Sequence, residues 1–499
     1  MIRWILGAAL LLVSLPASAQ PMGVSTERSA DLLWSGRTQM ERGRMEAAED
    51  SLRRLAARPD GRAAAFHGLA TVSLYQFFFT ESAAYADRFF RRADSLDAAI
   101  EAMRAGRWRR LARAEETLMR SMAYGRDGRY VRAAWYARTA AKKLEALHDD
   151  HPSFADAKFA LGLVHFFVGV LPRREQWVLS ILGFNGDAEQ GWNELQTAAR
   201  ESRLNRFPAT AVLAISDLML YGRSERARQR LDALSVPSGE SVLVDYLRGY
   251  ALIHARRADR AARVLQGAVD RARSEDYFYV DYLDYYLAQA RMLQGRYEDA
   301  ADLFRRYLGR HQGTALQATA TLQLGICVEM HGSWEAARSY YQLVSANRDF
   351  DSDKAAKRRA QRHARDAMTT VERRILRGRF AYDAGRYAQA DSLLRPLLDD
   401  DRLSDDEQAE VRYRLARTCH AQDRLGEALK LYQTVRNDPG ADRSKWGPYS
   451  RLYAGDIHAA RGDTTRAEAA YEAAREWPTP YDYAASLDQT ARLRLQAIQ

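Results

Sequence analysis

The sequence AQARMLQGRYEDAADLFRRY, from Ala288 to Tyr307, decides the fold. A small residue, Ala288, precedes Gly295, and Ala300 and Phe304 follow at a spacing that places both on one face of a helix. Glycine tolerates the left-handed conformation that often ends a helix, so we expect Gly295 to separate two helices. The stretch therefore predicts two short helices that pack against each other through small residues.

The pattern recurs along the chain. The alanines that correspond to Ala300 are Ala227, Ala261, Ala337, Ala390, Ala428 and Ala467. Successive members lie 34 to 39 residues apart, except for a gap of 53 residues between Ala337 and Ala390. This period resembles the tetratricopeptide repeat, a helix–turn–helix unit of about 34 residues. The resemblance implies an all-α fold, an α-solenoid of about 10 to 11 such units.

The repeats and their interruptions predict the domain organisation. In order, we expect a secretory signal peptide at 1–19, N-terminal repeats at 20–151, a repeat with a helical insert at 152–206, central repeats at 207–349, a basic helical insertion at 350–370, C-terminal repeats at 371–483 and a capping helix at 484–499. The final helix is expected because the last repeat of an array needs a partner for its apolar face.

The composition is that of a large folded protein. Of 499 residues, 47% are hydrophobic and 28% are charged, which excludes a disordered chain. The net charge is +10. The two cysteines, Cys327 and Cys419, exclude a disulfide-rich scaffold, and one whole repeat separates them. We therefore expect both to be unpaired core residues.

The first 20 residues have the pattern of an export signal. Arg3 supplies a positive start, an apolar run extends from Ile5 to Leu15, and Ala17 and Ala19 form a small-x-small cleavage motif. We expect cleavage between Ala19 and Gln20, because the apolar run is too short to span a bilayer. The predicted location is the periplasm, or the periplasmic face of the outer membrane, of a Gram-negative-type bacterium.

No catalytic or metal-binding motif is present in the sequence. Phosphate-binding loops, nucleophile elbows, zinc-protease motifs and dinucleotide fingerprints are all missing. The residues from His148 to His151 form the only tight cluster of possible metal ligands in the sequence. Polar residues are expected there anyway, because the cluster lies at the end of a helix before Pro152. Ser404 and Glu407 have the spacing of a capping box, which explains the acidic residues around them. We predict no catalytic residue, no metal and no cofactor.

The first helix of each tetratricopeptide unit lines the concave face of the array, and the resemblance implies a binding groove there. Counting from the small residue of each unit places the following residues in the groove: Tyr246, Tyr250, His254, Tyr282, Tyr285, Gln289, Met292, Glu329, Glu372, Arg379, Tyr382, Tyr413 and Arg417. Aromatic residues with mixed charge suit a peptide or a protein segment. The alternative is that these tyrosines pack between repeats.

Residues 152–200 interrupt the plain pattern. They resemble the insert of the tetratricopeptide repeat protein 39 family, whose fungal members act in inclusion-body clearance. The matching residues are Leu171, Pro172, Leu182, Gly183, Phe184, Gly186, Asp187, Gly191 and Leu195. The resemblance implies a helical insert between the two helices of one repeat. Trp177, Phe184 and Trp192 either fill its core or form a binding lip.

The segment 350–379 is strongly basic, with a net charge of +6. Its patch comprises Lys354, Lys357, Arg358, Arg359, Arg362 and Arg365. One interpretation is a solvated helix face, and the other is a patch that docks on anionic lipid or an acidic partner. Aromatic residues are scarce here, which disfavours nucleic acid as a partner.

The favoured function is an exported, non-catalytic scaffold that binds an envelope protein or peptide through its concave groove. One alternative is a membrane-surface module that docks on anionic lipid through residues 350–379. The other is a glycan-binding protein or enzyme accessory protein, in which the aromatic groove stacks on sugar rings. The sequence does not specify an oligomeric state.

Overall fold

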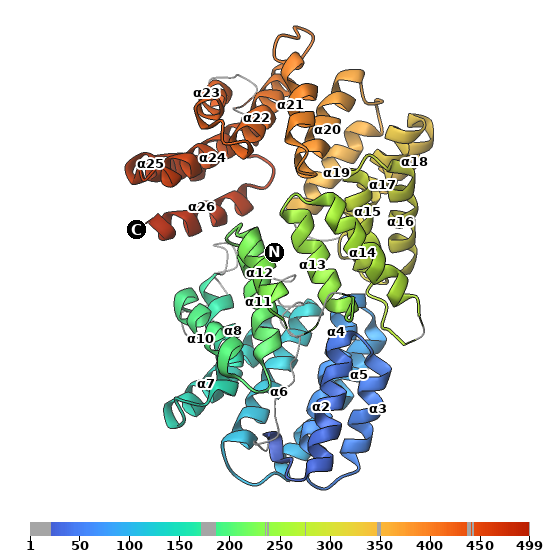
Figure 1. Ribbon diagram of the computed structural model, residues 1–499, viewed down its shortest axis with the longest axis vertical. Helices are drawn as coiled ribbons and strands as arrows, with labels where there is room; N and C mark the ends of the chain where they lie inside the picture. Colours follow the sequence, from blue (N-terminus) through green and yellow to red (C-terminus); the bar gives the residue numbers. More distant parts are fainter. Residues whose placement is uncertain are drawn as a thin grey trace.

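The computed structural model describes residues 21–170, 186–234, 236, 239–274, 276–346, 351–436, 441 and 444–498. Within these residues the chain forms 24 α-helices, two short 3₁₀ turns and no strand. Figure 1 shows the helices stacked side by side in chain order along a curved path. The fold is therefore the all-α solenoid that the repeats predicted.

The described helices form eleven consecutive pairs, in agreement with the expected number of repeats. The pairs are α2 (Glu27–Arg42) with α3 (Met45–Ala56), α4 (Arg62–Thr80) with α5 (Ala83–Glu101), α6 (Arg107–Arg126) with α7 (Tyr130–Asp150), α8 (Ala155–Gly169) with α10 (Ala188–Glu201), α11 (Arg206–Met219) with α12 (Ser224–Asp232), α13 (Val242–His254) with α14 (Ala258–Ala272), α15 (Tyr282–Leu293) with α16 (Tyr297–Arg310), α17 (Gln317–His331) with α18 (Trp334–Leu343), α20 (Thr370–Asp383) with α21 (Tyr387–Leu394), α22 (Asp405–Ala421) with α23 (Leu425–Arg436), and α24 (Trp446–Ala460) with α25 (Thr464–Arg475).

Two helices lie outside this pairing. The first, α19 (Asp351–His363), occupies the long gap between repeats and packs against α17. The second, α26 (Ala484–Ile498), covers the last pair. Leu487, Ala491 and Leu495 of α26 form one apolar cluster with Tyr471 of α25. The predicted capping helix is therefore present, and it completes the core of the last repeat.

Glycines at the turns and at the helix contacts explain the pairing. Gly295 ends α15 with φ at +79°, in the left-handed region that favours glycine. Gly332, at the corresponding turn after α17, is not left-handed, because its φ is −125°. There Ser333 caps α18 through its hydroxyl. At the helix contact, a Cβ on Gly325 would lie 2.6 Å from a ring carbon of Tyr341, so α17 approaches α18 closely.

Local predictions are confirmed for the capping box and for the two cysteines. Ser404 and Glu407 form the capping box at the start of α22. The Asp187 side chain accepts hydrogen bonds from two backbone N–H groups at the start of α10. Cys327 and Cys419 are buried and unpaired. Each of these features follows from residues close together in the sequence.

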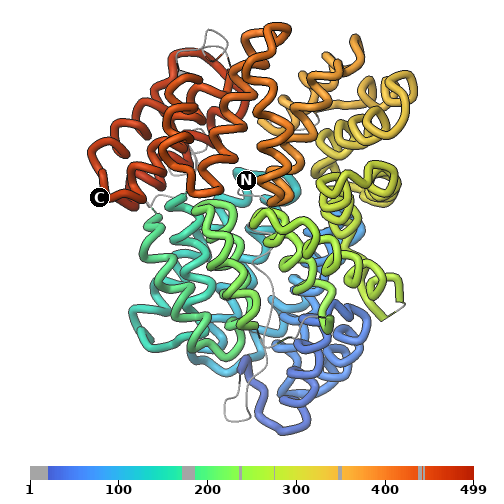
Figure 2. Tube along the Cα trace, turned by 45° about the horizontal axis from the view of Figure 1, so that its top comes forward, coloured from blue at the N-terminus to red at the C-terminus, as the bar shows by residue number. Residues whose placement is uncertain are grey.

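The array curls back on itself, so that its N-terminal repeats meet its central repeats (Figures 1 and 2). Phe278 donates its backbone N–H to the carbonyl of Gly43 at 2.8 Å. Further along, Arg386 forms an ion pair with Asp259 at 3.0 Å, which brings the turn before α21 against the start of α14. A Cβ on Gly385 would lie 2.1 Å from the carbonyl oxygen of Arg256, so only glycine permits this approach.

Among the described residues, no helix has both the length and the apolar character needed to cross a membrane.

Candidate functional site: a cationic, aromatic recess

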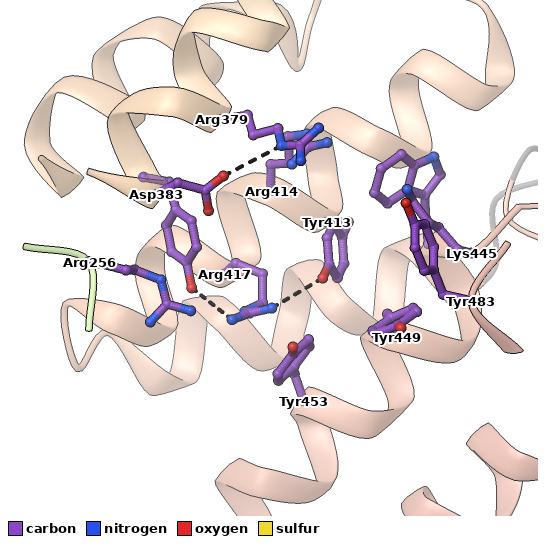
Figure 3. Close-up of a pocket in the computed structure, with 12 residues that line it drawn as sticks. Arg256, Arg379, Asp383, Tyr413, Arg414, Arg417, Lys445, Tyr449, Tyr453 and Tyr483 are labelled. Atoms are coloured by element: carbon purple, nitrogen blue, oxygen red, sulfur yellow. Dashed lines mark hydrogen bonds and ion pairs between the residues drawn. The ribbon is translucent and has the colours of Figure 1, made fainter. Parts of the chain in front are cut away.

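A recess with a cavity volume of about 270 Å³ lies among α20, α22 and α24, on the first helices of the three C-terminal repeats. We call it the C-terminal recess (Figure 3). Its lining residues are Arg256, Arg379, Tyr382, Asp383, Tyr413, Arg414, Arg417, Lys445, Trp446, Tyr449, Tyr453 and Tyr483. Five of them are basic, six are aromatic and one is acidic.

Arg417 occupies the centre of the recess and is held by tyrosines. Its guanidinium donates hydrogen bonds to the hydroxyls of Tyr382 at 2.8 Å and Tyr413 at 3.2 Å. The guanidinium carbon also lies 3.4 Å from the centroid of the Tyr453 ring. No carboxylate in the described part of the chain forms an ion pair with Arg417. Because both hydroxyls accept from Arg417, each still has its own proton to donate.

Lys445, just before α24, is a second cation without a carboxylate partner among the described residues. Its ammonium lies 4.9 Å from the centroid of the Trp446 ring and 5.1 Å from that of Tyr483. Burial, together with the guanidinium groups of Arg379 and Arg414, lowers the pKa of Lys445 to about 8. An anion bound in the recess would relieve this repulsion.

The other charges of the recess are partly balanced. Arg379 forms an ion pair with Asp383 at 3.5 Å, and Arg414 donates a hydrogen bond to Glu410 at 2.6 Å. Arg256 stacks on Tyr382, with its guanidinium carbon 4.6 Å from the ring centroid. The lining therefore offers many donors and few free acceptors, and this balance favours an anionic ligand.

One wall of the recess is aromatic. Trp446, Tyr449 and Tyr453 lie on successive turns of α24 and point to one side, as Figure 3 shows for the two tyrosines. The Tyr449 and Tyr453 rings stack with centroids 6.3 Å apart. The Tyr413 ring lies 5.2 Å from that of Trp446. Such a wall can contact the apolar part of a ligand beside its charge.

The structure brings together four residues of the predicted groove: Arg379, Tyr382, Tyr413 and Arg417. The others lie elsewhere. Tyr246 and Tyr282 face Phe79 of α4, with ring centroids 6.0 and 6.5 Å apart respectively. Arg126 also donates a hydrogen bond to the Tyr282 hydroxyl at 3.1 Å. The central part of the concave face is thus filled by the N-terminal repeats of the same chain.

The remaining central residues are mostly internal. Tyr285 is 2% exposed and packs against Phe304, with ring centroids 5.7 Å apart. Gln289 donates a hydrogen bond to the Tyr285 hydroxyl at 3.1 Å, and Met292 is buried. Here the packing interpretation of the tyrosines describes the structure better than a ligand-lined groove does.

Tyr250 and His254 lie at the end of α13. The Tyr250 ring is buried and contacts Tyr286 at a centroid distance of 4.9 Å. The His254 ring lies 4.5 Å from that of Tyr250, and its residue is exposed. His254 is therefore accessible, but it is not part of the C-terminal recess lining.

Glu329 is a fully buried structural residue. Its carboxylate accepts hydrogen bonds from the Tyr341 hydroxyl and the Met368 N–H, both at 2.6 Å, and pairs with Arg373 at 3.2 Å. These contacts join α17, α18 and α20 across the interruption that contains α19. The Glu329 carboxylate therefore binds partners within the chain and does not line a groove that is open to a ligand. Glu372 pairs with Arg362 at 2.9 Å.

The basic patch is divided by its surroundings. Arg358 pairs with Asp482, and Arg362 pairs with Glu372. Burial and the charge of Arg379 lower the pKa of Arg359 to about 10, so Arg359 belongs electrostatically with the recess. The exposed members are Lys354, Lys357, Arg358, Arg362 and Arg365. Docking through this patch stays a prediction.

Residues 171–185 of the predicted insert, including Trp177 and Phe184, lie outside the described residues, and so do the cleavage-site residues Ala19 and Gln20. Trp192 packs on Phe166 and Tyr221, with centroid distances of 5.7 and 5.3 Å. A Cβ on Gly191 would lie 2.2 Å from the backbone nitrogen of Phe166. The glycine of the insert motif therefore permits close contact between α8 and α10.

Sequence reasoning missed eight lining residues of the recess. Tyr449 and Tyr453 had a detectable signal, because they lie on the first helix of the next repeat, one unit beyond Arg417. Lys445 and Trp446 adjoin the start of that same helix. Arg256 and Tyr483 had no local signal, since the curvature of the array and the connection to α26 bring them to the recess.

Comparison with protein families agrees with this architecture. Residues 285–352 match the family described as Tetratricopeptide repeat, and residues 328–499 match the Tetratricopeptide repeat-like domain. Residues 285–499 belong to the tetratricopeptide-repeat superfamily. This tetratricopeptide-repeat region contains every lining residue of the recess except Arg256. Tetratricopeptide repeats indicate a scaffold for protein–protein interaction.

Two solved structures are distantly similar to the chain. A human IFIT1 dimer with PPP-AAAA is 13% identical in sequence, and its TM-score is 0.31. The match covers 86% of this chain and 94% of the IFIT1 chain. A Rap protein complexed with Competence and Sporulation Factor is 12% identical, with coverage of 83% and 98% and a TM-score of 0.30. Similarity at this level says nothing about ligands. No curated protein sequence matches the chain significantly.

Proposed function

We propose that this protein is an exported, non-catalytic scaffold that binds an acidic segment of a partner protein of the cell envelope in its C-terminal recess. One observation carries the proposal: Arg417 and Lys445 face the recess, held by aromatic side chains, and no described carboxylate pairs with either. A cation that is positioned in advance loses little side-chain entropy when an anion binds.

The chemistry of the recess favours carboxylates attached to a chain over a neutral peptide. Charge-assisted hydrogen bonds to a carboxylate are stronger than neutral ones, and Arg417 presents several donors in a planar group. The Tyr382 and Tyr413 hydroxyls supply further donors beside it. The aromatic wall of α24 would contact the apolar side chains that flank the acidic residues.

The location is the other part of the proposal. Its support is the sequence of the first 20 residues, with a positive start, a short apolar run and the Ala17–Ala19 cleavage motif. Fractionation of cells that express a C-terminally tagged chain tests it. We expect the tag in the periplasm or the outer-membrane fraction, with Gln20 as the first residue. Retention in the cytoplasm would contradict export without affecting the recess.

A matched pair of peptides tests the binding function. The first fluorescent peptide contains Glu residues that alternate with Leu and Tyr, and in the second each Glu is replaced by Gln. We expect binding of the Glu peptide, measured by fluorescence anisotropy, and a loss of at least about tenfold with the Gln peptide, because each charged hydrogen bond contributes about 1.5–3 kcal/mol. Equal binding of the two peptides would contradict an acidic ligand.

Variants of the chain locate the binding site. Arg417→Met removes the central cation, and Lys430→Met on the exposed side of α23 is the matched control. We expect the first change alone to abolish binding of the Glu peptide. Crosslinking in intact cells with the same variants then identifies the partner. Loss of binding in both variants would place the site elsewhere.

A further inference from the structure

The first half of α7 carries large apolar side chains on the protein surface. Val131 is 64% exposed, Trp135 is 57% exposed and Tyr130 is 47% exposed. Among described residues, only Leu343 on α18 is another large hydrophobic residue with comparable exposure. Three such side chains within two turns of one helix are unusual on a surface that is otherwise polar.

Val131 and Trp135 share one side of the helix with basic residues. At about 100° per residue, Val131, Arg132, Trp135 and Lys142 lie within an arc of about 100°. We call these four the α7 outer face and include Tyr130, which lies about 100° from Val131 but is exposed at the start of the helix. The opposite side of α7 is buried against its neighbours through Ala134, Ala140, Ala141, Leu144 and Leu147. Figure 1 shows α7 at the periphery of the molecule, in agreement with the exposure of Val131 and Trp135.

The charge of this segment has one sign. Residues 128–144 contain five basic residues and no Asp or Glu. Arg129 is paired with Asp127 at 2.7 Å, and Lys143 donates a hydrogen bond to Thr117 at 2.9 Å. Arg132 stacks on Tyr124, which leaves its charge without a carboxylate partner among the described residues. The acidic residues of α7 begin at Glu145 and lie toward its other end.

We propose that the α7 outer face docks the protein on a membrane surface rich in anionic phospholipid. Trp and Tyr rings favour the interfacial zone of a bilayer, and Val131 adds apolar area that can enter it. Arg132 and Lys142 can reach the headgroup phosphates while their aliphatic stems lie along the apolar zone. The apolar part of the face comprises only three side chains, whereas a stable protein interface takes about 20–30 residues from each side.

The arrangement separates two roles on one molecule. The α7 outer face belongs to an N-terminal repeat, and the C-terminal recess belongs to the last three repeats. Docking through α7 therefore leaves the recess free for a protein ligand. It also places lipid attachment on a segment different from the basic patch at 350–379.

Vesicle co-sedimentation of the chain from Gln20 onward tests the proposal, because this form retains every described helix and lacks the apolar leader. The probes are phosphatidylcholine vesicles with and without phosphatidylglycerol. We expect binding only to the vesicles that contain phosphatidylglycerol. The double variant Arg132→Gln/Lys142→Gln is expected to bind about 30-fold more weakly, from the usual contribution of two basic residues near an anionic surface. Trp135→Ser should weaken binding at unchanged melting temperature, since its side chain is exposed.

The matched control is Lys357→Gln/Arg365→Gln, which removes two exposed charges from the basic patch. We expect this control to bind like the parent chain. An equal loss in the control, or equal binding to pure phosphatidylcholine, would overturn the proposal. So would concentration-dependent dimerisation that Trp135→Ser abolishes, because the face would then bind a second copy of the chain.

Discussion

The lowered pKa of Lys445 links the candidate site to the stability of the fold. Its ammonium is surrounded by aromatic rings and by the guanidinium groups of Arg379 and Arg414, and its pKa falls to about 8. A lysine in the unfolded chain has a pKa of about 10.4. The folded protein therefore binds this proton less tightly than the unfolded chain does, so the protonated lysine opposes folding until a ligand neutralises it.

Lys445→Met should raise the melting temperature while it weakens binding of the Glu peptide, by about tenfold for one lost charged contact.

The pH dependence of stability and of peptide affinity follows from the lowered pKa of Lys445. In the parent chain, stability should rise between about pH 8 and 10, where the unfolded chain binds the proton and the folded chain does not. Peptide affinity should fall over the same range, as Lys445 loses its charge. Calorimetry and anisotropy at a series of pH values measure both.

Lys430→Met is the control for this prediction. Its lysine is exposed on α23, so neither the melting temperature nor the affinity should change appreciably. If Lys445→Met lowers both the melting temperature and the affinity for the Glu peptide, Lys445 stabilises the fold and is not held in place for a ligand.

At the scale of the helix pair, the contact between α17 and α18 depends on one missing side chain. The ring of Tyr341 lies 2.6 Å from the position that a Cβ of Gly325 would take, and the Tyr341 hydroxyl donates to buried Glu329. The ring therefore cannot shift without breaking that hydrogen bond. The same geometry recurs between Gly455 and Tyr471, where the distance is again 2.6 Å.

Gly325→Ala should lower the free energy of unfolding by about 1–3 kcal/mol, because it overpacks a filled contact. Gly267→Ala on α14 is the matched control, since no atom beyond its own stretch of helix lies within 4 Å of its Cβ position. There the better helix propensity of alanine should raise the free energy of unfolding by up to about 1 kcal/mol. Urea denaturation of the two variants measures this difference in sign, and changes of the same sign would contradict a steric origin.

At the scale of the whole molecule, contacts between distant repeats should make unfolding of the array more cooperative than that of an open solenoid. Phe79 of α4 lies against Tyr246 of α13 and Tyr282 of α15. In an open solenoid each repeat contacts only its neighbours. Here the second repeat and the central repeats share one apolar cluster, so they should stabilise one another.

Phe79→Ala should lower the free energy of unfolding by about 3 kcal/mol, as for other large buried aromatic residues. Hydrogen exchange should speed up in α13 and α15 as well as in α4, with α24 unaffected. Phe154→Ala is the matched control, because Phe154 is similarly buried but belongs to a separate cluster with Trp108. Its effect should be confined to α6, α7 and α8, and equal effects on α13 would contradict a specific long-range contact.

The residues of the candidate site could be predicted only in part from the sequence pattern of the repeats. The first helices were correctly identified as the source of recess residues, and counting along them reached Arg417 and Tyr413. The same counting gave Tyr246 and Tyr282, which lie under α4. Both sets have the same position within a repeat, so no property of the repeat itself distinguishes an open surface from a filled one.

The sequence by itself determined the helix pairs and their contact through small residues, the capping box at Ser404 and the capping helix at 484–499. Each depends on residues within one repeat or between adjacent repeats, where spacing and side-chain size specify the contact. Only the tertiary structure decided which part of the concave face stays open and that Arg256 reaches the recess. Those features depend on curvature, which is the sum of small rotations over many repeats, and no local pattern specifies that sum.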